Sequence, residues 1–596
     1  MIKTALSIFT GLLSCTVLAG SLQRPIDHII NQIDPKINMG MMVIDLNTGE
    51  TLYQRDVKKL LIPASNMKLF SDATALLALG PDYHFKTQLS TDASKIENGI
   101  LYGSLYLSLP GDPTFSSADL DQLLSKLQQL KIKQITGSFI LVSDFSHASA
   151  QPPGIVPKDL NYSYGAPTSP LIIDENRVTV TVNPSSQIGQ KALVEYSAPQ
   201  SSFIVDNQVT TVAGQVSGIG FTTTDDNHLI IHGKIGQNQS AIQDRIPIKN
   251  PLKHAEALIR VALKKQGIEF NGPIVLGAQK PSLLLATHHS KPLTQLLADT
   301  LKPSDNLYAN SLFLHAANKI KGQALDWLQA ETVVKQYLQQ QTGINMASAV
   351  LVDGSGLSRH DLLSAEQTVT LLCYLHERFP VAYEYIAALP IAGQDGTLQR
   401  RLRKPTQKGL IRAKTGSMTG ITSLSGYLYA ANGHTLAFAI YINTRPGTSP
   451  NVSGRYRSMI ETICDFLLKQ KPENLKRYVL SKNPQAHVAY QYQPSDAEKQ
   501  HSQVAKWRQI EYVLKQTLKN QPVTIVFRGQ QLLIMDNSSH WNTVWSSLQK
   551  LSPRYKIAVA LESSNSPSPS YNPHLLWVSG NQAGVNRVWT LHDVIG

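Results

Sequence analysis

The order of apolar and polar residues predicts strands at both ends of one unit. The run MGMMVIDLNTGETLYQRD (39–56) predicts two strands joined at the turn Asn47-Thr48-Gly49. The runs LIRAKTGS, SLSGYLYA and HTLAFAIYIN predict three more strands, with Asn432-Gly433 as the hairpin between the last two. Because helical spacing dominates between these two sets, we expect one α/β unit whose sheet is completed by distant segments.

Four apolar runs have the spacing of helices that would cover this sheet. The first begins at PASNMKLF, continues through Leu77 and ends near Gly80-Pro81. PLTQLLADTL and ETVVKQYLQQQ lie between 292 and 388, and RYRSMIETICDFLLKQ follows the last predicted strand. That final run is amphipathic, so it could cover one face of the sheet.

Two other regions differ from this unit in composition and residue pattern. Between about 86 and 280, short β-rich runs such as ILYGSLYLSL, RVTVTV and HLIIHGKI alternate with clusters of Gly, Pro, Asn and Ser. We therefore predict one or two inserted β-rich domains over 86–280, and a discontinuous catalytic domain over 20–85 and 281–475. A helix (VAKWRQIEYVLKQTL), a hairpin (VTIVFRGQQLLIMD), a second helix and two or three strands predict a small α+β domain of unknown role over 485–596.

The first residues have the pattern of an export signal. MIK is a short cationic start, TALSIFTGLLSCTVL is apolar, and Val17-Leu18-Ala19 offers small-residue cleavage before Gly20. This predicts a signal peptide over 1–19 and an exported, periplasmic protein. The alternative is a lipid anchor on Cys15 after Leu12-Leu13-Ser14, which the apolar residues after Cys15 disfavour.

Composition and charge narrow the partners. The chain has 596 residues, of which 42% are apolar and 16% charged, as in an ordinary globular protein. Its net charge of +13 indicates an anionic neighbourhood and permits peripheral association with the cell envelope. The charge is spread out and no nucleic-acid motif is present, so nucleic acid is not an expected partner. Cys373 and Cys464 match no metal-site spacing, and we expect two separately buried thiols, although export would permit a disulfide.

Ser65 and Lys68 are the first candidates for chemistry. Positions i and i+3 share one face of a helix, so the hydroxyl and the amine can meet. A serine hydroxyl becomes a good nucleophile when a base takes its proton, and lysine is such a base only if its pKa is lowered by burial or by another cation. The ordinary interpretation is a solvated surface lysine, and Ser547 and Lys550 repeat the same spacing.

Two further elements strengthen the case. Ser304-Asp305-Asn306 stands at the head of a predicted helix, and Lys414-Thr415-Gly416-Ser417 ends a predicted strand. At the strand end, Gly416 permits a ligand to approach the backbone, while Lys414, Thr415 and Ser417 offer one charge and two hydroxyls to a carboxylate. Each short pattern alone is weak, but three in this order are a strong signal.

This set resembles the penicillin-recognising serine acyltransferases. It is most similar to the low-molecular-mass class C penicillin-binding proteins, the D-alanyl-D-alanine carboxypeptidase/endopeptidase family, whose inserted domains separate the first two motifs widely. Supporting matches are Gly111-Asp112-Pro113-Thr114, YGAPTSPLIIDEN (164–176) and DGSGLSR (353–359). The resemblance covers roughly 23–470. It implies a transpeptidase/β-lactamase-like fold, with an antiparallel sheet flanked by helices.

The resemblance also implies the catalytic roles. Ser65 would attack the carbonyl of a D-Ala-D-Ala bond or a cross-link, and Lys68 would accept its proton. Ser304 would relay a proton to the leaving amine, and Asn306 would orient the peptide and Lys68. Backbone N–H groups of Ser65 and Ser417 would form the oxyanion hole. Water would then hydrolyse the acyl-enzyme, with no metal and no cofactor.

The resemblance implies that the substrate is a peptidoglycan stem peptide and that β-lactams acylate and inhibit the enzyme. It also implies which residues bind the substrate. Lys414 would add positive charge, and Thr415 with Ser417 would hold the terminal carboxylate. Asp144 and Arg359 resemble positions that face the diaminopimelate side chain in relatives. Both are also compatible with a structural or surface role, because the aromatic residue expected soon after Asp144 has no clear match.

The sequence is also compatible with two alternative functions. The first is a serine β-lactamase, which commonly needs an acid after the second motif, and 335–350 contains none. The second is a scaffold that binds the cell wall and has a vestigial catalytic core. The basic tail motivates this second alternative because it holds five of the six tryptophans, although these could equally be core residues.

Overall fold

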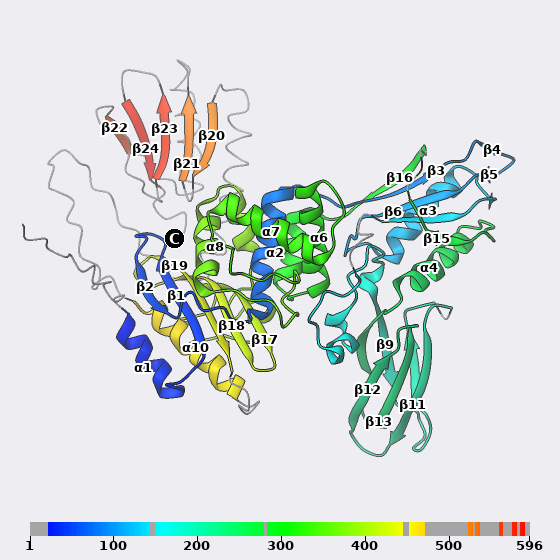
Figure 1. The fold of residues 1–596 in the computed structure, drawn as a ribbon, viewed down its shortest axis with the longest axis horizontal. Helices are drawn as coiled ribbons and strands as arrows, with labels where there is room; N and C mark the ends of the chain where they lie inside the picture. Colours follow the sequence, from blue (N-terminus) through cyan, green and yellow to red (C-terminus); the bar gives the residue numbers. More distant parts are fainter. Residues whose placement is uncertain are drawn as a thin grey trace, which may run out of the picture.

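The computed structural model describes residues 22–143, 149–199, 201–278, 280, 283–444 and 452–470, and the backbone of five strands between 523 and 590. The predicted signal peptide, Cys15, Asp144 and the predicted helices of the tail lie outside the described residues. Figure 1 shows the arrangement of the described elements.

The first unit is built on a five-stranded antiparallel sheet whose order is β17-β18-β19-β1-β2. Its strands are β1 (Met39–Asp45), β2 (Thr51–Arg55), β17 (Ile411–Met418), β18 (Ile421–Tyr429) and β19 (Thr435–Asn443). All five strands predicted for this unit are therefore confirmed. β1 pairs directly with β19, so segments from opposite ends of the unit lie side by side (Figure 1).

Helices cover both faces of this sheet. Residues of β19 alternate between two cores: Ala437, Ala439 and Tyr441 face one, whereas Phe438 and Ile440 face the other. On the second face pack α1 (Gln23–Ile33) and α10 (Val452–Leu468), which confirms the predicted covering helix. The first face carries α2 (Met67–Leu79), α5 (Leu293–Leu301), α6 (Asn306–Lys321), α7 (Trp327–Thr342), α8 (Ala365–Glu377) and α9 (Val381–Ala388).

The inserted region holds two separate cores. The first lies on a sheet of order β15-β8-β6-β3-β16, which packs against two helices that the predicted β-rich texture did not include. Its elements are β3 (Lys86–Thr91), β6 (Leu105–Leu109), β8 (Phe139–Ser143), β15 (Ile274–Leu276), β16 (Leu283–His289), α3 (Ser117–Gln129) and α4 (Pro251–Lys265). A small sheet of β4 (Lys95–Glu97), β5 (Ile100–Tyr102) and β7 (Gln134–Ile135) flanks it.

One boundary of the insertion differs from the prediction. The sequence predicts that the insertion ends at 280, which places the residues of β16 in the catalytic unit. β16 instead pairs with β3 in the inserted sheet, so the insertion runs to 289. The chain leaves the catalytic unit through β3 and returns to it through β16, and these two strands are hydrogen-bonded to each other. Local sequence does not encode such a long-range pairing.

The second inserted core lies between two three-stranded sheets. One sheet contains β9 (Arg177–Asn183), β10 (Leu193–Tyr196) and β14 (Ile242–Pro247), and the other contains β11 (Ile204–Val212), β12 (Ser217–Thr223) and β13 (His228–Gly236). The tail forms its own sheet of order β20-β21-β23-β24-β22. Its strands are β20 (Val523–Arg528), β21 (Gln531–Asp536), β22 (Ala560–Ser563), β23 (Leu575–Gly580) and β24 (Val585–Thr590), and β20 with β21 is the predicted hairpin.

Both cysteines of the described chain are free thiols. Cys373 on α8 is half-buried and Cys464 on α10 is buried, and they lie on opposite faces of the sheet. Burial raises the pKa of the Cys373 thiol to about 11 and that of Cys464 to about 12, so both are inert at neutral pH. Among the described helices, none combines the length and the apolar character needed to cross a bilayer.

Candidate active site

Ser65 and Lys68 meet at the start of α2. Ser65 lies in the 3-10 turn Ala64–Asn66, and the α-helix begins at Met67. Lys68 Nζ lies 3.1 Å from Ser65 Oγ, so the hydroxyl and the amine are hydrogen-bonded. Ser65 is half-buried, whereas Lys68 is fully buried on a helix that also buries the polar side chains of Ser71, Asp72 and Thr74.

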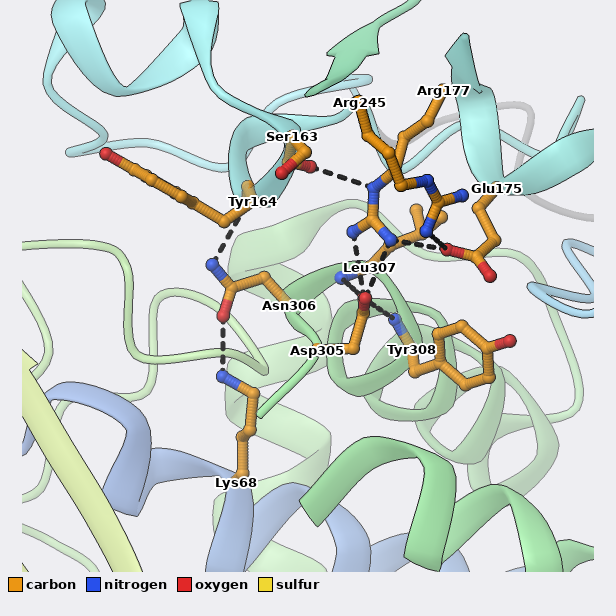
Figure 2. Close-up of polar contacts among 10 residues, drawn as sticks. All are labelled: Lys68, Ser163, Tyr164, Glu175, Arg177, Arg245, Asp305, Asn306, Leu307 and Tyr308. Atoms are coloured by element: carbon orange, nitrogen blue, oxygen red, sulfur yellow. Dashed lines mark hydrogen bonds and ion pairs between the residues drawn. The ribbon is translucent and has the colours of Figure 1, made fainter. Parts of the chain in front are cut away.

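Lys68 has two further oxygen partners. Its Nζ lies 2.6 Å from Asn306 Oδ1 and 2.7 Å from the carbonyl oxygen of Ser355. Asn306 Nδ2 donates to the carbonyl of Tyr164, which turns the amide oxygen towards Lys68 (Figure 2). Neither of these two oxygens can donate, while the Ser65 hydroxyl can. A neutral Lys68 would therefore keep its two N–H bonds on Asn306 and Ser355 and direct its lone pair at Ser65.

Burial also shifts the protonation equilibrium of the Lys68 amine towards the neutral form. Loss of hydration lowers the pKa of Lys68 from its usual 10.5 to about 8. The carboxylates of Asp353, Asp305, Asp72 and Asp361 oppose this shift, in that order. A neutral amine is thus accessible near physiological pH, which an exposed lysine does not offer.

The loop DGSGLSR holds the Ser355 carbonyl in place. Asp353 accepts bonds from the backbone N–H groups of Ser355, Gly356, Leu357 and Ser358. A Cβ at Gly356 would lie 1.9 Å from the carbonyl oxygen of Ala64, and its φ of +79° is left-handed. Only glycine fits this position, so the loop lies directly against the turn that carries Ser65.

The second motif stands at the N-terminus of α6, as predicted. Asp305 Oδ1 accepts from the backbone N–H groups of Leu307 (2.9 Å) and Tyr308 (3.3 Å) and caps the helix. Ser304, immediately before the cap, has a left-handed φ of 66°. Its Oγ accepts a bond from Lys414 Nζ at 2.7 Å, which joins the second motif to the third.

The third motif lies on β17, the edge strand of the catalytic sheet. A Cβ at Gly416 would lie 2.1 Å from Ser423 Oγ and 2.8 Å from the carbonyl oxygen of Pro63, so glycine permits the strand to approach the Ser65 turn. Lys414 is fully buried, and burial followed by the charge of Lys68 holds its pKa well below the usual range. Ser417 is exposed, whereas the Thr415 hydroxyl donates to Thr397 Oγ1 at 2.8 Å.

The structure does not join Arg359 or Asp144 to the hydrogen-bonded cluster of Ser65, Lys68, Ser304, Asn306 and Lys414. Arg359 is half-buried and its Nη1 donates to the carbonyl of Thr419, just past the end of β17. Asp144 lies outside the described residues. The substrate-side-chain roles of both residues remain predictions.

Several groups at the site were not predicted from the sequence. The carbonyls of Ser355 and Tyr164 contact Lys68 and Asn306 through the backbone, which leaves no residue-type signature, although both lie in runs that resemble the family, 353–359 and 164–176. Asp72, one helical turn after Lys68, is fully buried, and no described residue makes a hydrogen bond to either carboxyl oxygen. Burial raises its pKa well above the usual range, while the charges of Lys68 and Lys414 oppose that shift. In the described part of the chain, no cluster of His, Cys, Asp and Glu is placed to hold a metal ion.

Comparisons with known proteins point to one family. A sequence profile of the D-Ala-D-Ala carboxypeptidase 3 (S13) family matches residues 22–464. A D-alanyl-D-alanine carboxypeptidase from Actinomadura sp. (strain R39) is 32% identical over 459 residues, which cover 72% of this chain and 82% of that protein. The D-alanyl-D-alanine carboxypeptidase DacB of Haemophilus influenzae is 31% identical over 415 residues, which cover 68% of this chain and 85% of that protein.

Solved structures agree with the sequence comparisons. Two crystal structures of penicillin binding protein 4 (dacB) from Haemophilus influenzae superpose with TM-scores of 0.67 and 0.62 at 28% identity, and one of them is complexed with a β-lactam. Each alignment covers 75% of this chain and 99% of the other. The similarity confirms the predicted penicillin-recognising, β-lactamase-like fold.

The first prediction concerns the ionisation of Lys68. An amine must be neutral to accept a proton, so with Lys68 as the predicted base we expect the rate of Ser65 acylation by an activated thioester to rise by about tenfold between pH 7 and pH 9, with a midpoint near the pKa of about 8. Stopped-flow rates with mass-spectrometric assignment of the acyl group measure this. Lys68→Arg should stay protonated and lose the reaction at every pH, and a rate that is flat across this window in the parent protein would contradict the role.

Proposed function

This chain belongs to the D-Ala-D-Ala carboxypeptidase 3 (S13) family, and we propose that Ser65 is the nucleophile with which it cleaves peptidoglycan stem peptides. The chain is a serine hydrolase of the D-alanyl-D-alanine carboxypeptidase/endopeptidase type. One observation carries the assignment of the nucleophile: the buried Lys68 amine lies between the Ser65 hydroxyl and two oxygens that can only accept.

Acylation begins with proton transfer from Ser65 Oγ to Lys68 Nζ over a 3.1 Å contact. The serine oxygen then attacks the carbonyl carbon, and the new oxyanion is stabilised by the backbone N–H groups of Ser65 and Ser417. Asn306 Oδ1 and the Ser355 carbonyl keep accepting from Lys68, so they stabilise the ammonium that forms. The peptide C–N bond breaks when the leaving nitrogen receives a proton.

Ser304 and Lys414 are suited to deliver that proton. Lys414 Nζ donates to Ser304 Oγ at 2.7 Å, which leaves the serine's own hydrogen free for the leaving amine. As Ser304 gives up its proton it takes one from Lys414 Nζ, and the proton that Lys68 accepted from Ser65 is then relayed to Lys414, so the proton count of the site is unchanged. Lys68 returns to the neutral form and can take a proton from the water that hydrolyses the acyl-enzyme.

The open edge of β17 suits a peptide that ends in a carboxylate. Ser417 is exposed there, while the Lys414 amine and the Thr415 hydroxyl lie buried beside it and add one positive charge and a second hydroxyl. A terminal D-alanine carboxylate would be bound by these groups in a pentapeptide, as would the free carboxyl end of a cross-linked peptide. The same cluster therefore supports both carboxypeptidase and endopeptidase activity.

The carboxylates around Lys68 argue against an efficient β-lactamase. Asp353 is occupied by backbone N–H groups and Asp305 by an arginine, while burial keeps the pKa values of Asp72 and Asp361 well above the usual range. Asp72, Asp353 and Asp361 are fully buried and Asp305 is paired with Arg177, so none of these four described carboxyls is an accessible base for a deacylating water. In addition, the amine expelled from a β-lactam stays tethered to the acyl group, whereas D-alanine leaves and makes room for water.

We further propose that the chain is exported to the periplasm, where stem peptides are found. The support is the cationic start, apolar run and small-residue site over 1–19, which lie outside the described residues. The spread positive charge of +13 favours peripheral association with anionic envelope polymers.

The central test is D-alanine release. The purified protein should free D-alanine from a pentapeptide ending in D-Ala-D-Ala or cut cross-linked muropeptides, both read by mass spectrometry. Ser65→Ala should lose at least about 1,000-fold in rate, because the nucleophile is gone. Ser547→Ala, which removes the serine of the second Ser-x-x-Lys pattern, should leave the rate unchanged. If the parent protein binds muropeptides without any turnover, the scaffold alternative is correct.

A second test separates peptidase from β-lactamase. A fluorescent penicillin should label Ser65 covalently, and the label should survive gel filtration because the tethered leaving group and the lack of a free carboxylate both slow hydrolysis. Peptide mapping locates the label. Rapid turnover of nitrocefin would instead assign the protein to the β-lactamases.

The export proposal predicts the mature N-terminus. Intact mass and N-terminal sequencing of protein from the producing cell should give a chain that begins at Gly20. A diacylglyceryl group on Cys15 would favour the lipid-anchored alternative, and an uncleaved chain in the cytoplasm would refute export.

A further inference from the structure

The inserted region contacts the second catalytic motif through a buried arginine. Arg177, the first residue of β9, makes a two-pronged ion pair with Asp305, through Nη1 to Oδ2 at 2.7 Å and Nη2 to Oδ1 at 3.1 Å (Figure 2). The Arg177 side chain is only 4% exposed, so this pair is shielded from solvent. Buried, two-pronged pairs fix geometry far better than exposed ones.

Asp305 joins this arginine to the catalytic machinery. The same carboxylate caps α6, and its neighbours in sequence are Ser304 and Asn306, which contact Lys414 and Lys68. A shift of Asp305 would thus move both neighbours. The charge of Arg177 also lowers the pKa of Asp305, which keeps the cap ionised.

A second contact from the insertion reaches the same motif. Two consecutive carbonyls in the 3-10 turn Ser163–Gly165 are used: that of Ser163 accepts from Arg177 Nε at 2.9 Å, and that of Tyr164 accepts from Asn306 Nδ2 at 2.9 Å. One turn of the insertion therefore orients both the arginine and the catalytic asparagine (Figure 2).

The backbone on both sides of the ion pair is conformationally costly. Asp174, Glu175 and Asn176, which lead into Arg177, have left-handed φ values of 51°, 58° and 49°. Ser304, which leads into Asp305, has 66°. Left-handed residues other than glycine persist only where their surroundings determine them, and such strain gathers at functional sites.

We propose that the insertion completes the active site, with Arg177 as a positioning residue that holds Ser304 and Asn306 in register through Asp305. This rests on the proposed function, since it concerns the rate at which Ser65 is acylated. The insertion is therefore required for the chemistry, in addition to any part it has in binding the cell wall.

The network supplies a matched control. Arg245 on β14 also pairs with Glu175, at 2.9 Å, but it is 45% exposed and its described contacts do not include Asp305. Arg245→Met removes a cation from the same network without touching the second motif. We therefore expect Arg177→Met to slow acylation of Ser65 by penicillin roughly 100-fold, and Arg245→Met to change it less than about twofold.

The pH dependence of acylation distinguishes positioning from general destabilisation. Lys68 is faced by Asp72 on α2, Asp305 at the cap of α6, Asp353 and Asp361 in the loop before α8, and Lys414 on β17. Loss of the cation in Arg177→Met leaves Asp305 uncompensated, so the midpoint of the pH profile should move to higher pH. Asp305→Asn removes an anion near Lys68, so its midpoint should move to lower pH. A loss of stability alone predicts neither shift.

Two more variants keep the inference testable. Arg177→Lys should return the midpoint towards that of the parent protein but not the rate, because a lysine cannot form the two-pronged pair. If Arg177→Met does not fold, the double variant Arg177→Met/Asp305→Asn, which leaves no uncompensated charge, should fold and remain slow. Equal rates and midpoints in Arg177→Met and Arg245→Met would overturn the inference.

A wrong assignment of the nucleophile can be told apart from a wrong role for Arg177. If the parent protein is never acylated by penicillin, the assignment of Ser65 fails. The inference on Arg177 is then read from urea unfolding of the parent, the two single variants and the double variant. Strong non-additivity in that cycle supports the ion pair as the link between insertion and second motif, and additivity refutes it.

Discussion

The structure depends on a lysine amine that has no contact with water. A buried amine without partners is strongly unfavourable, so Lys68 requires oxygen atoms around it, and these come from three separate segments. The same burial that demands these partners lowers the pKa of Lys68 to about 8 and makes it a usable base. Stability and chemistry therefore impose one requirement: the turn of Ser65, the cap of α6 and the loop of Ser355 must meet.

Close backbone approaches make that meeting possible. Gly356 and Gly416 press against the Ser65 turn, one against the Ala64 carbonyl and the other against that of Pro63. Any side chain at either position would push the loop or the edge strand away. The sheet is also assembled from distant strands, since β1 pairs with β19, so the catalytic unit forms only when the regions on both sides of the insertion are present.

The inserted region has cores of its own, but its contacts reach the catalytic motif itself. Arg177 and the carbonyl of Tyr164 act on adjacent residues of that motif, Asp305 and Asn306. The strands that lead into and out of the insertion, β3 and β16, are paired with each other. An insertion anchored in this way can place a side chain as accurately as the catalytic sheet does.

The sequence by itself determined the elements and the chemistry of single residues. Periodicity and turn residues predicted the strands of the catalytic sheet, and the spacing of Ser65 with Lys68 predicted that a hydroxyl and an amine meet on one helical face, as they do. Only the tertiary structure showed which backbone groups and distant side chains contact these residues. The carbonyls of Ser355 and Tyr164, the role of Arg177 and the membership of β16 in the inserted sheet all arise from contacts between distant segments. Such contacts depend on where the chain returns in space, and every residue type carries the same carbonyl, so no local pattern could reveal them.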